Sequence, residues 1–318
     1  MADPTLRVGI TLGDPRGIGP EVAARAVRLL GSDAPDLLLI GPSGTESDAL
    51  DLPLDEVGAW QRTGTPAQAG RLAGLAIERA TTLALAGDID ALVTAPIDKN
   101  ALHAAGFSFP GHTEMLAHLC GDVQVGMLMC AEHTRDGGTL RVLLATTHLP
   151  LRAVPDAVTI DRLVEQADLL DGALRRDWGL ASPRLALCAL NPHASDGGLF
   201  GSEEADVFAP AIARMRQDGL VVRGPVPADT VFVRALRGEF DAVIAPYHDV
   251  GMAAFKTATF GSGVNVTIGL PFARTSPDHG TALDIAGQGK ADATSMVEAI
   301  RLAARLSAGR GRLTSSRE

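Results

Sequence analysis

The sequence predicts an α/β protein of two domains, with mostly parallel sheets covered by helices on both faces. Short, continuously apolar runs are separated by longer segments whose apolar residues recur at helical spacing. Strands that are apolar throughout are typical of parallel sheets buried on both faces. The length of 318 residues gives about two domains as a starting expectation.

The individual elements follow from the same patterns. The apolar runs predict strands at residues 6–12, 37–40, 91–94, 140–146, 184–190 and 242–245. Helical spacing predicts helices at residues 20–30, 71–86, 115–119, 160–178, 203–217, 229–236 and 294–307. The first helix starts with Pro20 and Glu21, a pair suited to a helix N-terminus. Because no linker marks a domain boundary, we expect the chain to cross between the domains.

Composition excludes several classes of function. Acidic residues outnumber basic ones, 38 to 28, and the net charge of -10 disfavours a non-specific nucleic-acid binder. No apolar run reaches the ~18 residues that a membrane span needs. Three widely spaced cysteines do not suggest a disulfide framework, and the first ten residues lack the features of a signal peptide. We therefore expect a cytoplasmic protein.

Three histidines follow predicted strands at the same kind of position. His148, His193 and His248 each come at or just after the end of an apolar run. In open α/β sheets, ligands bind beyond the carboxyl ends of the strands. Three imidazoles with an open position would suit a zinc-like divalent ion. The spacings of 45 and 55 residues form no local ligand motif, so the alternative is three polar residues satisfied at strand ends.

The glycine-rich turn at residues 13–21, GDPRGIGPE, suggests a dinucleotide site but lacks the usual fingerprint. Val22 stands where the third glycine would be, and no acid closes the second predicted strand, where Ile40 leads into Gly41. The turn also lacks the Lys-Ser/Thr pair of a P-loop. It either feeds a helix N-terminus or lines a ligand cleft.

Two further stretches hold candidate ligand-binding residues. His112 and Thr113 precede the short helix predicted at residues 115–119, where they could bind an anion or simply cap the helix. Lys256 and Arg274 are cations that could clamp a phosphate or carboxylate, although either alone is more often a solvated surface charge. The same stretch contains Asn265, Asp278 and His279.

Taken together, these segments resemble the 4-hydroxythreonine-4-phosphate dehydrogenase family and its close paralogues over nearly the whole chain. A more distant resemblance links residues 279–287, HGTALDIAG, to the nucleotide-binding loop of isopropylmalate and isocitrate dehydrogenases, which bind NAD(P) without the usual fingerprint. The segments that carry the main resemblance are GDPRGIGPE, TAPIDK, PGHTE, TTHLPL, NPHASDGGLFGSEE, PADTVF, YHD, GVNVTIGLP and RTSPDHGTALDIAG.

The resemblance implies a set of site residues. The metal ligands would be His148, His193 and His248, holding one zinc, magnesium or cobalt ion per site, with His248 given to the partner subunit of a homodimer. The substrate contacts would be His112, Thr113, Lys256, Asn265 and Arg274. NAD or NADP would lie along His279, Gly280, Thr281, Asp284 and Gly287. The general base is left open: Asp249 and Asp229 are candidates that could instead orient a ligand, and Lys256 is a further catalytic candidate.

The resemblance also implies a fold and a reaction. The fold would be isopropylmalate-dehydrogenase-like, with the active site in an interdomain cleft. A cofactor-side domain would span residues 1–110 and 258–318, and a metal- and substrate-side domain carrying the dimer interface would span residues 111–257. The reaction would be NAD(P)-linked oxidation of 4-phosphooxy-L-threonine at C3, followed by decarboxylation, in pyridoxal 5'-phosphate biosynthesis.

Two alternatives remain open. PGHTEMLA and the residues around NPHA also occur in the phosphothreonate group, so the substrate could be 4-phospho-D-threonate or 4-phospho-D-erythronate in sugar-acid catabolism. A non-catalytic ligand-binding or metal-sensing protein with this fold is the other class.

Overall fold

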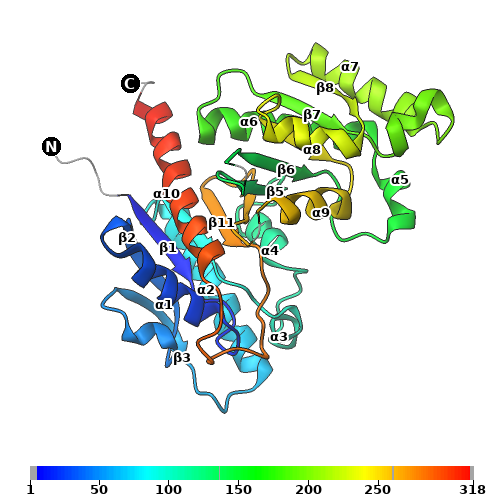
Figure 1. The fold of residues 1–318 in the computed structure, drawn as a ribbon. Coiled ribbons are helices and arrows are strands. Elements are labelled where there is room, and N and C mark those ends of the chain that lie inside the picture. Colours follow the sequence, from blue (N-terminus) through cyan, green and yellow to red (C-terminus); the bar gives the residue numbers. More distant parts are fainter. Residues whose placement is uncertain (1–5, 136, 260, 316–318) are drawn as a thin grey trace. The chain divides into compact units, whose positions relative to one another are not determined.

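The computed structural model describes residues 6–135, 137–259 and 261–315 (Figure 1). They form two compact units. Unit 1 contains the described residues up to Val125 and from Leu270 onward, and unit 2 runs from Gly126 to Gly269. The chain therefore crosses from one unit to the other twice, at 125/126 and at 269/270. The boundaries expected from the sequence were 110/111 and 257/258.

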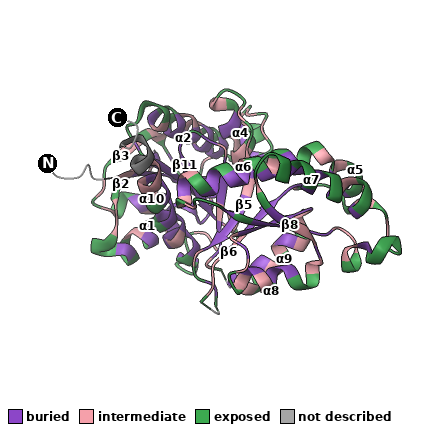
Figure 2. Ribbon diagram, turned by 90° about the horizontal axis from the view of Figure 1, so that it is seen from above, coloured by how far each residue is buried: buried purple, intermediate pink, exposed green. Residues whose placement is uncertain are grey.

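The sheet of unit 1 is parallel throughout. Its order is β3 (Leu54–Ala59), β2 (Asp36–Ser43), β1 (Arg7–Thr11), β4 (Ala91–Thr94) and β11 (Ala273–Pro277). Helices α1 (Gly19–Leu30) and α10 (Thr294–Ser315) lie on one face, and α2 (Pro66–Ala86) and α4 (His112–Leu119) lie on the other (Figure 2). These helices bury the apolar strands on both sides, as the sequence predicts.

Helix α2 shows how local sequence sets an element's start. The Thr65 side chain accepts a hydrogen bond from the Gln68 backbone N–H at 3.2 Å, and the Gln68 side chain accepts one from the Thr65 N–H at 2.8 Å. This reciprocal capping box, with Pro66 at the first helical position, begins the helix five residues before the predicted start at residue 71. The helix ends at Gly87, whose φ of 79° is a left-handed conformation that glycine adopts readily.

The sheet of unit 2 is mixed. Its order is β10 (Val264–Ile268), β5 (Gly126–Ala131), β6 (Leu140–Leu144), β9 (Ala242–Ala245), β7 (Arg184–Cys188) and β8 (Val221–Val226). Strands β6, β9, β7 and β8 are parallel, whereas β5 runs antiparallel to both β6 and β10. The predicted mostly parallel α/β architecture is confirmed, with this antiparallel part as an addition.

Helices cover both faces of the unit 2 sheet. Figure 2 shows α6 (Ile160–Trp178) and α7 (Ala209–Gln217) on one side and α8 (Ala228–Leu236) and α9 (His248–Thr259) on the other. Phe232 and Phe255 of the latter pair pack against Leu144 and Val243 of the sheet. Among the described helices, none has the length and hydropathy that would let it cross a membrane.

Short elements connect these layers. They are Gly31–Asp33 (η1), Glu46–Ala49 (η2), α3 (Lys99–Ala104), Leu151–Ala153 (η3), α5 (Val154–Ala157), Pro192–Gly198 (η4) and a π-type turn at Glu204–Phe208 (η5). One of them, η4, carries His193.

Candidate functional site

Unit 1 contains a deeply buried arginine at the position predicted to bind substrate. Arg274 lies on β11 with only 2% of its surface exposed. Its guanidinium donates a hydrogen bond to the hydroxyl of Thr94, at the end of neighbouring β4. Burial lowers the pKa of Arg274 to about 10, against a smaller raising influence of Glu114. The side chain therefore stays charged at neutral pH, and it is not a solvated surface cation.

His112 lies close enough to this cation for its titration to be affected. It is the first residue of α4, and its Nε2 atom is buried with no hydrogen-bond partner in the described chain. Burial, together with the positive charges of Arg274 and Lys99, lowers the pKa of His112 well below its usual value. The imidazole is therefore neutral at physiological pH, next to two cations and a helix N-terminus. These features favour an anionic ligand over a simple helix cap.

Lys99 completes the cationic group of unit 1, which we define as the two cations Arg274 and Lys99 together with the neutral imidazole of His112. Lys99 starts α3, which is capped by Asp98, and a side chain built on Gly111 would meet the Lys99 Cε atom at 3.7 Å. The sequence analysis quoted TAPIDK but gave Lys99 no role. The clue was available, because Lys99 comes five residues after the end of buried strand β4, on the side of the sheet edge where ligands bind in this fold class.

The glycine-rich turn and the predicted cofactor residues form one surface in unit 1. The Ile18 N–H donates to the Thr281 carbonyl at 2.9 Å, and the Gly287 N–H donates to the Glu21 carboxylate at 2.9 Å. A Cβ on Gly17 would stand 2.8 Å from the Thr281 carbonyl oxygen, so only glycine permits this approach. The turn therefore contacts the 279–287 loop and also leads directly into helix α1.

The remaining predicted cofactor residues lie along the same loop. His279 has a buried Nε2 atom without a hydrogen-bond partner among the described residues, and Gly280 and Asp284 are exposed. Gly287 takes a φ of 70°. The loop is thus exposed at Gly280 and Asp284, takes a left-handed turn at Gly287, and has an imidazole nitrogen that a ligand could bond. These features are compatible with a bound dinucleotide.

Unit 2 places all three predicted metal ligands after the carboxyl ends of parallel strands. His148 follows β6, His248 begins helix α9 after β9, and His193 lies in η4 after β7. The rings of His148 and His248 are close, with centroids 5.4 Å apart. His193 does not join them, since no three His, Cys, Asp or Glu side chains among the described residues are placed to hold a metal ion. Two imidazoles are fewer than the three protein ligands typical of catalytic zinc, so this part of one chain does not make a complete site.

Asp249 contacts one of these histidines directly. His248 Nδ1 lies 2.7 Å from Asp249 Oδ1, and because a carboxylate only accepts hydrogen bonds, Nδ1 is the donor. That contact leaves the lone pair of His248 Nε2 available to a ligand. Of the two roles considered for Asp249, general base or orienting group, the geometry favours the orienting one.

The loop that carries His193 is built around a buried carboxylate that the sequence analysis missed. Glu204 accepts hydrogen bonds from the backbone N–H of Leu190 and Asn191, at 2.9 and 2.7 Å, and from the hydroxyl of Ser195. Burial alone would raise the pKa of Glu204, but the bonds from Asn191 and Ser195 outweigh burial and lower it. The carboxylate stabilises residues 193–197, which all have φ between 42° and 70°.

The other predicted residues of unit 2 are more scattered. Asn265 lies on β10 with a buried Oδ1 atom that has no hydrogen-bond partner in the described chain. Lys256 is an exposed residue of α9, two turns after His248, and Asp229 is an exposed residue in the first turn of α8, which packs near η4. This geometry does not select Asp229 as a base.

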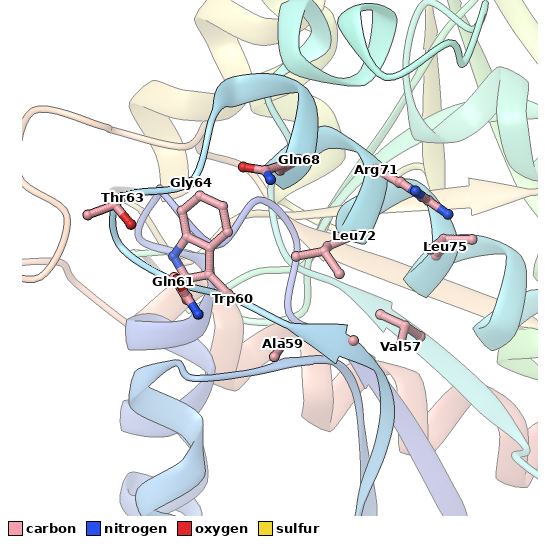
Figure 3. Close-up of a pocket in the computed structure, with 11 residues that line it drawn as sticks. Val57, Ala59, Trp60, Gln61, Thr63, Gly64, Gln68, Arg71, Leu72 and Leu75 are labelled. Carbon is pink, nitrogen blue, oxygen red and sulfur yellow. The ribbon is translucent and has the colours of Figure 1, made fainter.

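A cavity of about 570 Å³ in unit 1 contains none of the predicted site residues (Figure 3). It lies between β3 and α2, with Trp60 at one end and Gln68, Arg71 and Leu72 projecting from the helix. Its only charged lining residue is Arg71. It holds no part of the glycine-rich turn or of the 279–287 loop, so it does not extend the candidate site.

Comparisons with known structures show the class of protein: an α/β fold shared with dehydrogenases. A crystal structure of 4-hydroxythreonine-4-phosphate dehydrogenase from Klebsiella pneumoniae matches with a TM-score of 0.83 and 38% identity, covering 95% of this chain and 99% of that one. A beta-decarboxylating dehydrogenase from Thermococcus kodakarensis shares the fold alone, with a TM-score of 0.50 at 16% identity over 97% of this chain and 88% of that one. The predicted fold class is thus confirmed.

Sequence comparisons then define the family. The family model described as pyridoxal phosphate biosynthetic protein PdxA matches residues 22–303, and the chain belongs to this family. It is 45% identical to 4-hydroxythreonine-4-phosphate dehydrogenase of Paracoccus denitrificans, over 95% of this chain and 98% of that protein. It is also 45% identical to a protein of Bradyrhizobium diazoefficiens named putative D-threonate 4-phosphate dehydrogenase, over 95% of this chain and 97% of that one. The resemblance stated from the sequence is confirmed.

Proposed function

We propose that this chain is a cytoplasmic, NAD(P)-dependent, metal-dependent enzyme that oxidises 4-phosphooxy-L-threonine at C3 and decarboxylates the product. Loss of a hydride and the hydroxyl proton gives a 3-keto acid, which releases CO2 to leave 3-amino-2-oxopropyl phosphate. The observation that carries this proposal is the buried cationic group of unit 1, in a chain of the PdxA family. The pathway served would be pyridoxal 5'-phosphate biosynthesis.

The chain's own residues supply binding and orientation. Arg274 is a fixed cation on a strand, and the His112-Thr113 start of α4 adds backbone N–H groups and a hydroxyl. Such a group binds a phosphate dianion by charge-assisted hydrogen bonds, which helps to position the substrate. Lys256 and Asn265 are proposed as further substrate contacts. A phosphate bound near neutral His112 would raise the pKa of that imidazole and favour its protonation.

The cofactors are proposed from the residues that would hold them. The 279–287 loop would bind the dinucleotide, and His148, His193 and His248 would bind a zinc, magnesium or cobalt ion. When bound, the nicotinamide supplies a hydride acceptor and the metal ion a Lewis acid that lowers the pKa of the substrate hydroxyl. Asp249 would hold His248 in the tautomer that presents Nε2.

A homodimer would complete the metal site. His148 and His248 lie together within one chain, which supports a site that takes these two from one protomer and His193 from its partner. The family resemblance implied His248 as the crossing residue instead. The loops after β6 and β7 also expose Leu149, Leu151, Leu199 and Phe200, at 46–76% of their surfaces, which suits burial against a second copy.

A second candidate substrate is D-threonate 4-phosphate, or the related erythronate. Its support is the Bradyrhizobium relative, whose identity of 45% equals that of the Paracoccus relative. The two substrate types differ at C2, where one carries an ammonium group and the other a hydroxyl, so the phosphate site alone does not distinguish them.

One rate assay tests the proposed function and separates the candidates. Purified protein would be given 4-phosphooxy-L-threonine, D-threonate 4-phosphate or D-erythronate 4-phosphate with NAD+ or NADP+, with and without added zinc or magnesium. We expect reduced nicotinamide and CO2 to form fastest with the first substrate, and none with unphosphorylated 4-hydroxythreonine. A faster rate with a sugar-acid phosphate would establish the second candidate. No turnover with any of them would refute the proposal and leave the non-catalytic alternative.

A further inference from the structure

A second cavity of unit 1 lies beside the 279–287 loop and has a volume of about 230 Å³. It forms where four segments meet: the glycine-rich turn after β1, the turn η2 after β2, the residues that follow β3, and the end of the 279–287 loop. Its lining includes Gly17, Glu46, Arg62 and Gly287. Trp60 forms a wall of this cavity and also lines the larger one in Figure 3.

Glu46 occupies a position where dinucleotide-binding α/β proteins use an acid. No acid stands where Ile40 leads into Gly41, the position expected for the end of the second strand. In the structure β2 continues to Ser43, and Glu46 begins η2 three residues later, facing the same cavity as Gly17. In such folds an acid after the second strand accepts hydrogen bonds from the ribose hydroxyls of NAD. Because β2 runs three residues beyond its predicted end at residue 40, Glu46 was not recognised as the acid that follows the second strand.

The charges around the cavity disfavour an additional phosphate. Arg16 also lines the cavity, but it already pairs with Asp14 at 2.7 Å and with Asp98 at 2.8 Å. Arg62 approaches Glu46 at only 3.4 Å, and its side chain is 84% exposed, against 36% for Glu46. Glu46 is thus better enclosed than Arg62, the one arginine of the lining that Asp14 and Asp98 do not pair. The attraction of a well-exposed arginine for an anion is weakened by water and salt.

We infer that Glu46 is the residue that selects NAD over NADP, by accepting the adenosine ribose hydroxyls and repelling a 2'-phosphate. This inference rests on the proposed binding of a dinucleotide along the 279–287 loop. The loop is fixed against the cavity because Glu21 accepts the Gly287 N–H at 2.9 Å and the Ala291 N–H at 3.4 Å, and Ile18 donates to Thr281. A cofactor on this loop would therefore meet Glu46 in a defined place.

Direct binding measurements test the inference without relying on turnover. Dissociation constants for NADH and NADPH would be measured by nicotinamide fluorescence for the wild-type protein, Glu46→Gln, Glu46→Asp and Asp51→Asn. We expect the wild type to bind NADH at least about tenfold more tightly than NADPH, and Glu46→Gln to reduce this ratio by about tenfold. Glu46→Asp keeps the charge and should keep most of the preference. Asp51→Asn makes the same charge change at an exposed position outside the cavity lining and should leave the ratio within about twofold.

Several outcomes would overturn the inference. An unchanged ratio in Glu46→Gln, with circular dichroism showing a folded protein, would refute it while leaving the proposed function intact. A wild-type preference for NADPH that disappears in Arg62→Ala would assign the cavity to a 2'-phosphate instead. If the wild type bound neither dinucleotide, the proposed function would fail and the inference with it.

Discussion

The two units prepare their candidate ligand sites in different ways. In unit 1 the cationic group is assembled within one chain: Arg274 is buried, bonded to Thr94, and close enough to help depress the pKa of His112. In unit 2 His148 and His193 are less enclosed, and only the pair of His148 and His248 comes together. The described contacts of unit 1 thus lie within one chain, whereas those of unit 2 bring only two of the three predicted metal ligands together.

The difference follows from where each side chain is anchored. Arg274 projects from the interior of a strand, so the sheet fixes its place. The unit 2 histidines stand on turns and at a helix start beyond the strand ends, where position depends on local contacts such as Glu204 with its loop and Asp249 with His248. The charge of unit 1 is therefore held in place by the sheet, whereas the proposed metal site of unit 2 would need a second copy of the chain to bring its ligands together.

The largest expected effect comes from removing the buried cation. Arg274→Ala should lower kcat/KM for the phosphorylated substrate by on the order of 10³, which corresponds to about 4 kcal/mol, within the range for a buried charge partner. The KM for the dinucleotide should change by no more than about threefold. Steady-state kinetics with each substrate varied in turn measures both quantities.

The control is an exposed arginine of the same unit. Arg79 pairs with Asp55 on the surface at 2.8 Å, and Arg79→Ala should leave both kinetic constants within about twofold. Equal losses for substrate and dinucleotide in Arg274→Ala would contradict an anion site built around this residue.

A smaller effect is expected from the carboxylate that holds the His193 loop. Glu204→Gln replaces an acceptor of several hydrogen bonds by an amide, and should lower the free energy of unfolding by about 1.5–3 kcal/mol. The neighbouring Glu203 accepts a hydrogen bond from the Asn191 side chain at 2.7 Å, and Glu203→Gln should cost less than about 1 kcal/mol. Chemical denaturation of both variants measures the difference. Equal costs would show that Glu204 has no special role in this loop.

The remaining prediction is a pH dependence of stability from His112. Its pKa is lower in the folded protein than the usual 6.5, so the unfolded state binds the proton more tightly. Stability from this group is therefore present above pH ~6.5 and is lost as the pH falls below it, with a slope that approaches about 1.4 kcal/mol per pH unit. His112→Gln should lack this component. Parallel stability curves for the two proteins between pH ~4 and ~8 would contradict the buried, neutral imidazole.

The sequence predicts the layers of this fold better than its edges. Continuous apolar runs such as residues 91–94 and 242–245 match β4 and β9 residue for residue, because buried parallel strands carry an unbroken hydrophobic pattern. The strands missed were β3, β5, β8, β10 and β11. The run LDEVGA of β3 is interrupted by two acids, and β5 and β10 pair antiparallel with strands distant in the sequence.

The same distinction applies to the candidate site, where some residues can be found from local sequence and others only from packing. The expectation that ligands bind beyond strand ends is enough to single out His148, His193 and His248 from the sequence alone, and a charged residue such as Arg274 is visible as a candidate. Sequence does not show that Arg274 is buried, that Glu21 supports the 279–287 loop, or that Glu204 organises the loop of His193. Each of these depends on contacts between segments whose proximity is set by packing, and no local pattern encodes them.

The central claim, that the histidines of unit 2 form a metal site only with a second copy, has one direct test. Inactive His148→Ala and His193→Ala chains would be mixed, with subunit exchange verified by native mass spectrometry. If His148 and His248 come from one chain and His193 from its partner, each heterodimer regains one intact site, and activity should recover to about one quarter of wild type. Mixing His148→Ala with His248→Ala should restore nothing. Recovery in that second mixture alone would make His248 the crossing residue, and no recovery in either would contradict a shared site.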